Sequence, residues 1–277
     1  MKECENRLFV AYKPSFISSN SFLSKIKKRY KVKKAGFSGT LDPFARGVLI
    51  VAFSQYTKLF RYLKKSPKVY KTTLWLGAKS ETLDIEGVFK IEDVKKFDKK
   101  DILKVLNSLK GEIEYLPPKF SAKKIDGKRA YKMAREDKDF SLEKVKSEVY
   151  DIKFISYMHP FLTFEVSISE GGYIRSIGEM IAKKLGVDGA LSYLERVREG
   201  DFVYENEKAL DPSLYLKVKE NFYLNDIENV LKGKKLKKED FRFQEDGEYF
   251  IKCGGFLSIV KIEKDRVTYE VNGIKLC

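Results

Sequence analysis

Histidine and cysteine are scarce in this chain of 277 residues, which contains one histidine and three cysteines. His159 precedes Pro160 and has no serine, cysteine or aspartate pattern around it, so the sequence does not indicate a Ser-His-Asp or Cys-His catalytic arrangement. The spacing of Cys4, Cys253 and Cys277 matches neither a disulfide framework nor a metal cluster. We therefore expect a reducing compartment, no metal, and chemistry that depends on carboxylates, tyrosine, lysine or arginine.

Long apolar segments are also missing. No uninterrupted apolar run approaches the roughly 20 residues that cross a bilayer. The N-terminus carries Glu3 and Glu5, and no apolar segment of a secretory signal follows them. We expect a soluble, cytoplasmic protein with no membrane partner. A hydrophobic fraction of 43%, with 20 phenylalanines and 16 tyrosines, excludes a mainly disordered chain.

The charge is strongly positive. Lysine and arginine number 55 against 40 acidic residues, which gives a net charge of +15. Such an excess favours a polyanionic partner, because basic side chains neutralise phosphates and release counterions. A lysine-rich composition with solvated runs, such as residues 25–29, is the competing explanation. Nucleic acid is the favoured partner, and both interpretations stay open on composition alone.

One stretch, residues 34–53, combines a turn-forming loop with an apolar strand. Three glycines between residues 36 and 47 flank Asp42-Pro43, so the backbone there can turn tightly and approach another molecule. Six consecutive apolar residues, 48–53, predict a strand buried on both faces that would fix the loop. A carboxylate on a rigid element suits covalent or acid–base chemistry. On local grounds alone, Asp42-Pro43 as a helix start or an ordinary turn is the favoured interpretation.

Helical and strand patterns are mixed along residues 1–205 without regular βαβ alternation, which predicts an α+β fold. Apolar periodicity predicts strands over residues 8–12, 48–53, 68–76, 145–154 and 161–169. It predicts helices over residues 19–30, 57–63, 98–110, 128–135 and 173–185.

The character of the chain changes after about residue 206. A lysine-rich run, residues 232–238, leads to short strand patterns over residues 248–251, 256–262 and 267–271. These patterns predict a small C-terminal β domain, and we place the division between residues 1–225 and 226–277. The basic run is either a phosphate contact or a solvated linker.

Several stretches, in the same order, resemble the TruB-type pseudouridine synthases. They are residues 36–47, 68–70, 76–77 with 82–87, 117–122 with Gly127 and Tyr131, 171–175, and 194–196 with 200–202. The resemblance implies a pseudouridine synthase catalytic domain with a mixed, mainly antiparallel sheet, followed by a domain similar to a shortened PUA-type RNA-binding domain. It implies conversion of the T-loop uridine at tRNA position 55 to pseudouridine, with no cofactor and no metal. We expect a monomer whose partner is the T stem-loop of tRNA.

The matching motifs also imply roles for three residues. Asp42 would be the catalytic nucleophile. Tyr70 would stack on the flipped uracil and act as a base, although a strand aromatic packed in the core is the alternative. Arg175 would pair with Asp42 and keep it ionised, and the alternatives are a phosphate contact or a solvated arginine at a helix start. The residues do not decide whether the carboxylate attacks the sugar or the base, or stabilises an oxocarbenium-like species.

Further residues are expected at the substrate by the same resemblance. Tyr173 and Leu194 would line the pocket, and ordinary core packing explains Leu194 almost as well. Four basic residues would contact phosphate or would simply be exposed charges: Lys13, Lys58, Lys123 and Arg196. The chain departs from the family pattern at two places, with Phe37 where histidine is usual and Gly172 where threonine is usual. Phe37 cannot donate a hydrogen bond, so stacking or apolar support is expected there.

Two rival functions stay open at this point. One is a non-catalytic RNA-binding or tRNA-folding protein built on the same scaffold. The other is a pseudouridine synthase for another RNA site. A metal hydrolase or a phosphate-loop enzyme is disfavoured, because neither a ligand set nor the glycine-lysine phosphate motif is present in the sequence.

Overall fold

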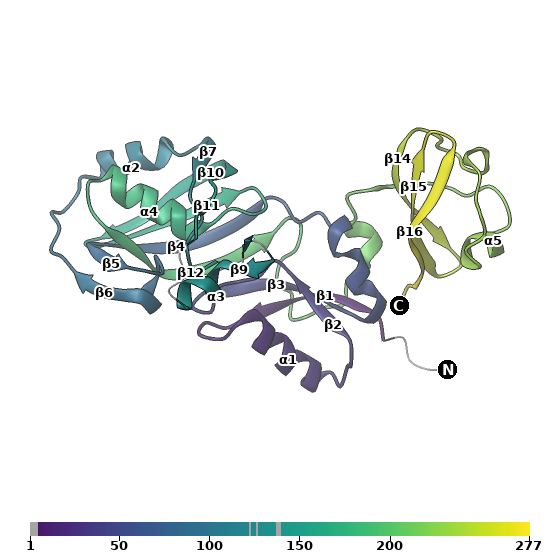
Figure 1. Cartoon of the computed structure of the whole chain (residues 1–277), viewed down its shortest axis with the longest axis horizontal. Coiled ribbons are helices and arrows are strands. Elements are labelled where there is room, and N and C mark those ends of the chain that lie inside the picture. Colours follow the sequence, from purple (N-terminus) through teal and green to yellow (C-terminus); the bar gives the residue numbers. More distant parts are fainter. Residues whose placement is uncertain (1–4, 122, 126, 137–139) are drawn as a thin grey trace.

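The computed structural model describes residues 5–121, 123–125, 127–136 and 140–277, so Glu3, Cys4 and Ala122 lie outside it. Its main feature is a large sheet with the order β1-β3-β12-β4-β11-β10-β7 (Figure 1). These strands are β1 (Arg7–Lys13), β3 (Arg46–Phe53), β12 (Gly189–Glu199), β4 (Lys68–Leu76), β11 (Phe161–Ile168), β10 (Val145–Met158) and β7 (Gly111–Tyr115). A further strand, β2 (Ala35–Ser38), pairs with the second half of β3.

The ladders of this sheet are antiparallel except for the short contact of β3 with β12, which is parallel. The predicted α+β class with a mixed, mainly antiparallel sheet is therefore confirmed. β12 lies between β3 and β4, although the sequence patterns did not predict a strand there. Its charged residues Glu195, Arg196 and Glu199 obscure the apolar alternation that usually marks a central strand.

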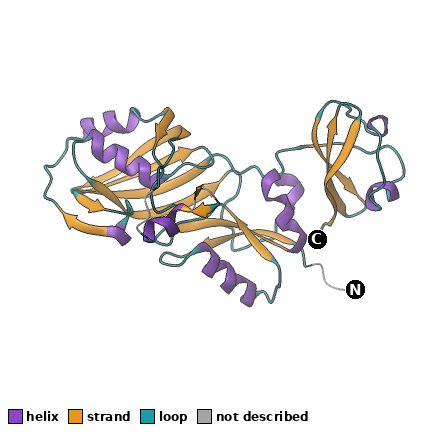
Figure 2. Cartoon of the chain, in the orientation of Figure 1, coloured by secondary structure: helices purple, strands orange, loops and turns teal. Residues whose placement is uncertain are grey.

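Three α-helices pack against the large sheet (Figures 1 and 2). On one face, α2 (Lys99–Asn107) and α4 (Ile174–Lys184) pack against β4, β10, β11 and β12 through an apolar core that includes Ile102, Leu106, Ile177 and Ile181. On the same face, α1 (Ser19–Arg29) packs against β1 and β3. The remaining small elements before residue 145 are β5 (Ala78–Ser80), η2 (Ile85–Gly87), β6 (Val88–Ile91), β8 (Lys124–Ile125), β9 (Lys128–Arg129) and α3 (Ala130–Arg135).

The apolar strand after the glycine-rich loop is buried on both faces, as predicted. Leu49, Val51 and Phe53 face the core under α1. Val48 and Ile50 face a second core that contains the 3-10 helix η1 (Ser54–Tyr62). Because both faces are packed, β3 is a rigid base for the loop that precedes it.

The C-terminal part of the chain forms a separate four-stranded sheet. Its order is β13 (Lys219–Glu220), β14 (Gly247–Cys253), β15 (Phe256–Glu263) and β16 (Arg266–Lys275). The connecting segments contain η3 (Pro212–Tyr215), α5 (Glu228–Leu231) and η4 (Lys238–Asp240). Leu257 and Ile259 of this sheet share one apolar cluster with Tyr56 and Leu59 of η1. The C-terminal sheet therefore packs against the preceding part of the chain through η1. The division at residue 225 stays a prediction.

Several predicted elements differ in detail from the observed ones. Residues 57–63 belong to a 3-10 helix rather than an α-helix, the helix predicted over 98–110 ends at Asn107, and residues 128–129 form a strand before α3 begins. β2 was expected to be loop, but its backbone pairs with β3. Among the described residues, no helix is long and apolar enough to cross a membrane.

Gly47 permits the close approach of β3 to β12. Its φ is +112°, and a Cβ atom added there would lie 2.2 Å from the carbonyl oxygen of Arg196. Gly111 has a similar φ of +96°, but an added Cβ would meet no atom within 4 Å. The two glycines therefore separate the cost of backbone strain from the cost of a steric clash.

We predict that Gly47→Ala lowers the free energy of unfolding by at least about 2 kcal/mol more than Gly111→Ala, which carries only the backbone cost of about 1 kcal/mol. Urea denaturation of both variants measures the difference. Equal losses would contradict the steric role of Gly47.

Candidate active site

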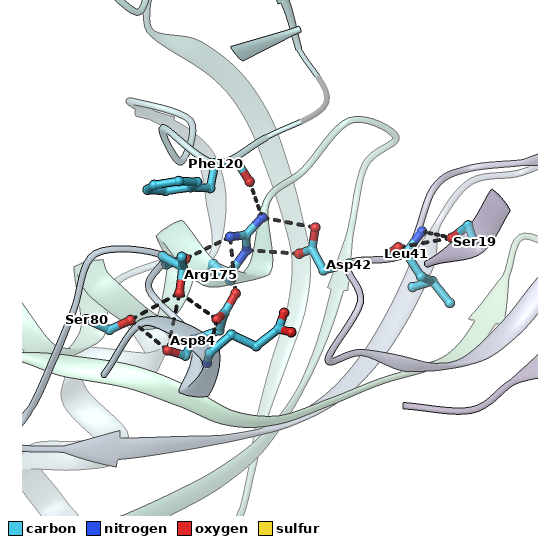
Figure 3. Close-up of polar contacts among 9 residues, drawn as sticks. Ser19, Leu41, Asp42, Ser80, Asp84, Phe120 and Arg175 are labelled. Atoms are coloured by element: carbon cyan, nitrogen blue, oxygen red, sulfur yellow. Dashed lines mark hydrogen bonds and ion pairs between the residues drawn. The ribbon is translucent and has the colours of Figure 1, made fainter. Parts of the chain in front are cut away.

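The loop between β2 and β3 presents Asp42 at a surface cavity. Figure 3 shows the Asp42 carboxylate facing Arg175. The Ser19 hydroxyl donates to the carbonyl of Leu41 and accepts from its backbone N–H, each at 3.0 Å. The N–H of Ala45 donates to the carbonyl of Asp42 at 3.1 Å. Asp42 thus lies in a tight turn, as its local sequence favours, and does not cap a helix. The turn fixes the backbone on both sides of a carboxyl group whose side chain is 33% exposed.

Arg175, at the start of α4, holds the Asp42 carboxylate with two nitrogens. Its Nη2 donates to Oδ1 at 3.0 Å, and its Nε lies 2.9 Å from Oδ2. Nη2 also donates to the carbonyl of Phe120 at 3.0 Å, and Nη1 donates to the carbonyl of Thr82 at 2.7 Å. The Arg175 side chain is only 4% exposed. The guanidinium is therefore a fixed, desolvated partner for one face of the carboxylate, and the expected pairing is present.

Asp84 is a second carboxylate on the same guanidinium, and the sequence analysis assigned it no role. Its Oδ2 lies 3.2 Å from Nη1 of Arg175, and its Oδ1 accepts from the Thr82 hydroxyl at 2.6 Å and the Glu86 N–H at 3.0 Å. Burial raises the pKa of Asp84, while the Thr82 hydrogen bond and the charge of Arg175 oppose that increase. The sequence did contain a signal for this role, because Asp84 is an acidic residue within the family motif of residues 82–87.

A cavity of about 260 Å³ lies beside the Asp42 carboxylate. Its lining includes most of the predicted site residues: Asp42, Tyr70, Tyr173, Arg175, Leu194 and Arg196. Tyr70 and Leu194 are also nearly buried members of the core under α4, so the cavity wall is continuous with the apolar core. Burial raises the pKa of the Tyr173 phenol, so it stays protonated and can donate a hydrogen bond at neutral pH.

Lys13 does not lie where a phosphate contact needs it. It is fully buried, and its Nζ donates to the carbonyls of Pro14, Ile17 and Pro43 at 2.9, 2.7 and 3.2 Å. The predicted phosphate contact is therefore wrong for Lys13 in this structure. Instead, its ammonium ties β1 to the turn that carries Asp42.

Arg196 is also fully buried. Its Nε donates to the carbonyl of Val48 at 2.9 Å and its Nη2 to the carbonyl of Gly39 at 2.8 Å. The guanidinium thus joins both ends of the Asp42 loop to β12. Although Arg196 lines the cavity, the structure corrects its expected role from an exposed phosphate contact to a support of the loop.

The other predicted residues lie outside the cavity lining. Lys58 is exposed on η1, and Lys123 is near the surface with its Nζ 3.3 Å from the carbonyl of Glu143, so their phosphate contacts stay predictions. Phe37 packs against the core under α1, which agrees with apolar support rather than base stacking. Gly172, by contrast, lines the cavity, and it has no room for a side chain because an added Cβ would lie 2.4 Å from Cδ1 of Ile168.

Over the described ranges, no group of three or more histidine, cysteine, aspartate or glutamate side chains is placed to hold a metal ion. Asp42 and Asp84 are instead both engaged by Arg175.

Comparison with known proteins identifies the family. Residues 27–174 match the model of the TruB family pseudouridylate synthase, N-terminal domain. The chain is 57% identical to the tRNA pseudouridine synthase B of Nitratiruptor sp. over 97% of this chain and 98% of that protein. It is 48% identical to the protein of the same name from Campylobacter jejuni, over 98% of this chain and all of that protein. The chain therefore belongs to the TruB family of pseudouridylate synthases.

Solved structures show the same fold. A Cbf5-Nop10-Gar1 complex contains a chain that matches with a TM-score of 0.70 at 20% identity, over 97% of this chain and 84% of that chain. An H/ACA RNP bound to a substrate RNA contains a chain that matches with a TM-score of 0.69 at 18% identity, over 98% of this chain and 85% of that chain. At this identity the likeness supports the pseudouridine synthase fold and nothing more specific.

We predict that Arg175→Met lowers the free energy of unfolding by about 3 kcal/mol, because the buried Asp84 loses its cation. Turnover should also fall sharply, because Asp42 loses its fixed partner. Arg175→Lys keeps the charge but not the planar fork, so it should recover part of the stability and little of the turnover. Urea denaturation and single-turnover assays measure both effects, and full turnover in Arg175→Met would refute the role of the ion pair.

Lys13 gives a pH dependence with a defined sign. Burial lowers its pKa from 10.5 to about 8. The unfolded state therefore binds more protons than the folded state between about pH 8 and 10.5, and deprotonation favours folding in that window. We predict that the stability of the wild type rises, relative to Lys13→Met, as the pH increases through this window. Denaturation curves at several pH values test this, with Lys58→Met as an exposed-lysine control; a constant difference would contradict it.

Proposed function

We propose that this protein converts the T-loop uridine at position 55 of tRNA to pseudouridine, with Asp42 as the catalytic carboxylate. The proposal rests on one observation: two guanidinium nitrogens of the buried Arg175 contact the carboxylate of Asp42, which is partly exposed at the edge of a cavity. Membership of the TruB family supports the reaction class. The shared name of relatives at 48 to 57% identity, tRNA pseudouridine synthase B, supports tRNA as the substrate.

The reaction needs the uridine to leave its stack before any bond changes, because a stacked base hides its C1′–N1 bond and C5 atom. In our proposal the uracil ring enters the cavity and lies against Tyr70, one of its lining aromatic side chains. Leu194 supplies a second, apolar surface of the same cavity. Closure around the base would exclude water from the reacting atoms.

The bond changes balance without any added reactant. The C1′–N1 bond breaks, the uracil turns, and a C1′–C5 bond forms. C5 then loses its proton and N1 gains one, so the product is an isomer of the substrate. Asp42 serves this sequence either as a nucleophile or by stabilising positive charge on the sugar. Tyr70 is our candidate to accept the C5 proton.

The charge arrangement keeps Asp42 available for this role. One guanidinium faces two carboxylates, Asp42 and Asp84, so the group retains excess negative charge. In the interior, Asp84 accepts a hydrogen bond from Nη1 of Arg175. The remaining face of Asp42 is open to the cavity, where a developing cation on the sugar would be stabilised.

The wider surface suits a phosphate-rich partner. A net charge of +15 favours association with RNA through phosphate neutralisation. Lys58 and Lys123 remain our candidates for phosphate contacts outside the cavity. A monomeric state and a cytoplasmic location are part of the same proposal.

We predict that Asp42→Asn abolishes pseudouridine formation, with a loss of about 10⁴-fold or more, because the isosteric amide is not a nucleophile. The affinity for tRNA should change little, since one buried contact contributes little to a large phosphate interface. Asp93→Asn removes an exposed carboxylate and serves as the control. The measurements are pseudouridine formation in an unmodified tRNA transcript and filter binding of the same RNA.

Conversion by Asp42→Asn at the rate of the control variant would eliminate Asp42 as the catalytic group. Tight tRNA binding by the wild type without conversion would instead favour a non-catalytic RNA-binding protein.

A further inference from the structure

The cavity has a second charged group that the Asp42–Arg175 pair does not explain. β4 and β12 pair so that Lys68 lies opposite Glu199 and Tyr70 lies opposite Arg196. Lys68, Tyr70 and Arg196 all line the cavity. A lysine, an arginine and a glutamate therefore meet beside the candidate base-stacking tyrosine.

All three side chains are buried, and the two cations, Lys68 and Arg196, share the carboxylate of Glu199. The Nζ of Lys68 lies 3.2 Å from Oε1 of Glu199, and Nη2 of Arg196 lies 3.2 Å from Oε2. The side chain of Lys68 is 8% exposed and that of Glu199 is fully buried. Two cations face one anion, so the cluster carries one unneutralised positive charge inside the site.

The hydrogen bonds show which cation is available. Arg196 already donates from Nε to Val48 and from Nη2 to Gly39, so it is committed to the loop. Within the described part of the chain, the one ion pair of the Lys68 ammonium is with Glu199. An ammonium has three N–H donors, and leaving donors unmet in the interior is costly. Donors of Lys68 thus remain for a ligand in the cavity.

We propose that Lys68 is a substrate-binding residue whose ammonium holds the phosphate of the target nucleotide, and that Glu199 is the positioning residue for that ammonium. Lys68 and Tyr70 are two residues apart on one strand, so they share a face and lie about 7 Å apart along it. With the base against Tyr70, that separation suits the sugar–phosphate rather than the base edge. The inference rests on the proposed function.

The positive charge of Lys68 extends into the cavity. Glu170 lines the same cavity and forms an ion pair with Lys65 at 3.0 Å. Burial raises the pKa of Glu170, but the Lys65 hydrogen bond and the charges of Lys65, Lys68 and Lys217 outweigh burial and lower it overall. An incoming phosphate would meet the same field.

A purely structural role explains this cluster less well. Replacing a buried ion cluster by apolar residues is often neutral or stabilising, so burying three charges is a poor way to gain stability alone. Gly39 also leaves the cluster room, because an added Cβ would lie 3.0 Å from Nζ of Lys68 and 2.9 Å from Oε1 of Glu199. The Asp42 loop therefore passes directly over the charged groups.

The test is steady-state pseudouridine formation in a tRNA transcript by Lys68→Met, measured at several salt concentrations. We expect KM to rise about 10-fold or more, as for loss of a charge-assisted hydrogen bond, with a much smaller change in kcat. The slope of log affinity against log salt should fall by about one. Lys71→Met is the matched control, because Lys71 is exposed on the opposite face of β4 and lies outside the cavity lining.

Lys68→Met leaves Glu199 without one of its cations, so a second variant guards against misfolding. Lys68→Met/Glu199→Gln removes both charges and should show the same rise in KM. The proposal would be overturned if the Lys68 variants had the KM and the salt slope of Lys71→Met. A fall in kcat at unchanged KM would also overturn it, because Lys68 would then contact the reacting base rather than the phosphate. Wild-type protein that converts no uridine would refute the proposed function instead, so the two failures are distinguishable.

Discussion

The buried guanidinium of Arg175 is the interaction on which the rest of the site depends. It extends from the first turn of α4 and contacts Asp42 from the β2–β3 loop, Asp84 from the turn before η2, and the backbone carbonyls of Thr82 and Phe120. Three separate segments thus converge on one planar cation. An arginine suits this position because its five donors lie in a fixed plane and stay charged in the interior. The orientation of the carboxylate follows from that plane.

The surrounding fold keeps the Asp42 loop in register with this cation. Lys13 secures the loop from β1 by donating to Pro43, and Arg196 secures it from β12 by donating to Gly39. β3 continues from the loop into two apolar cores, so the loop cannot shift without disturbing both. Two buried basic side chains lie beside the partly exposed Asp42 because each satisfies a backbone carbonyl that the tight turn would otherwise leave unpaired.

The sequence predicted the fold class and the elements with clear periodicity, and it was weakest where charge is buried. Residues 48–53 could be assigned to a buried strand because a short run of six apolar residues between turn residues is typical of one. The resemblance brought Asp42 and Arg175 together, and their catalytic roles stay predictions. β12 was missed because the sequence shows Arg196 and Glu199 as two charged residues and does not show that they form a buried ion pair. Lys13 was misassigned for the same reason, since a lysine is expected at the surface until its three carbonyl partners are seen.

In the proposed reaction, a uridine turns out of its RNA into the cavity beside Asp42. A crystal structure of Asp42→Asn bound to a T stem-loop RNA tests it most directly. We predict that the uracil ring lies against Tyr70, that its C1′ atom lies next to residue 42, and that the Arg175 contacts to Asp84 are unchanged. A uridine that stays stacked in the loop, or an RNA bound away from the cavity, would contradict the proposed reaction.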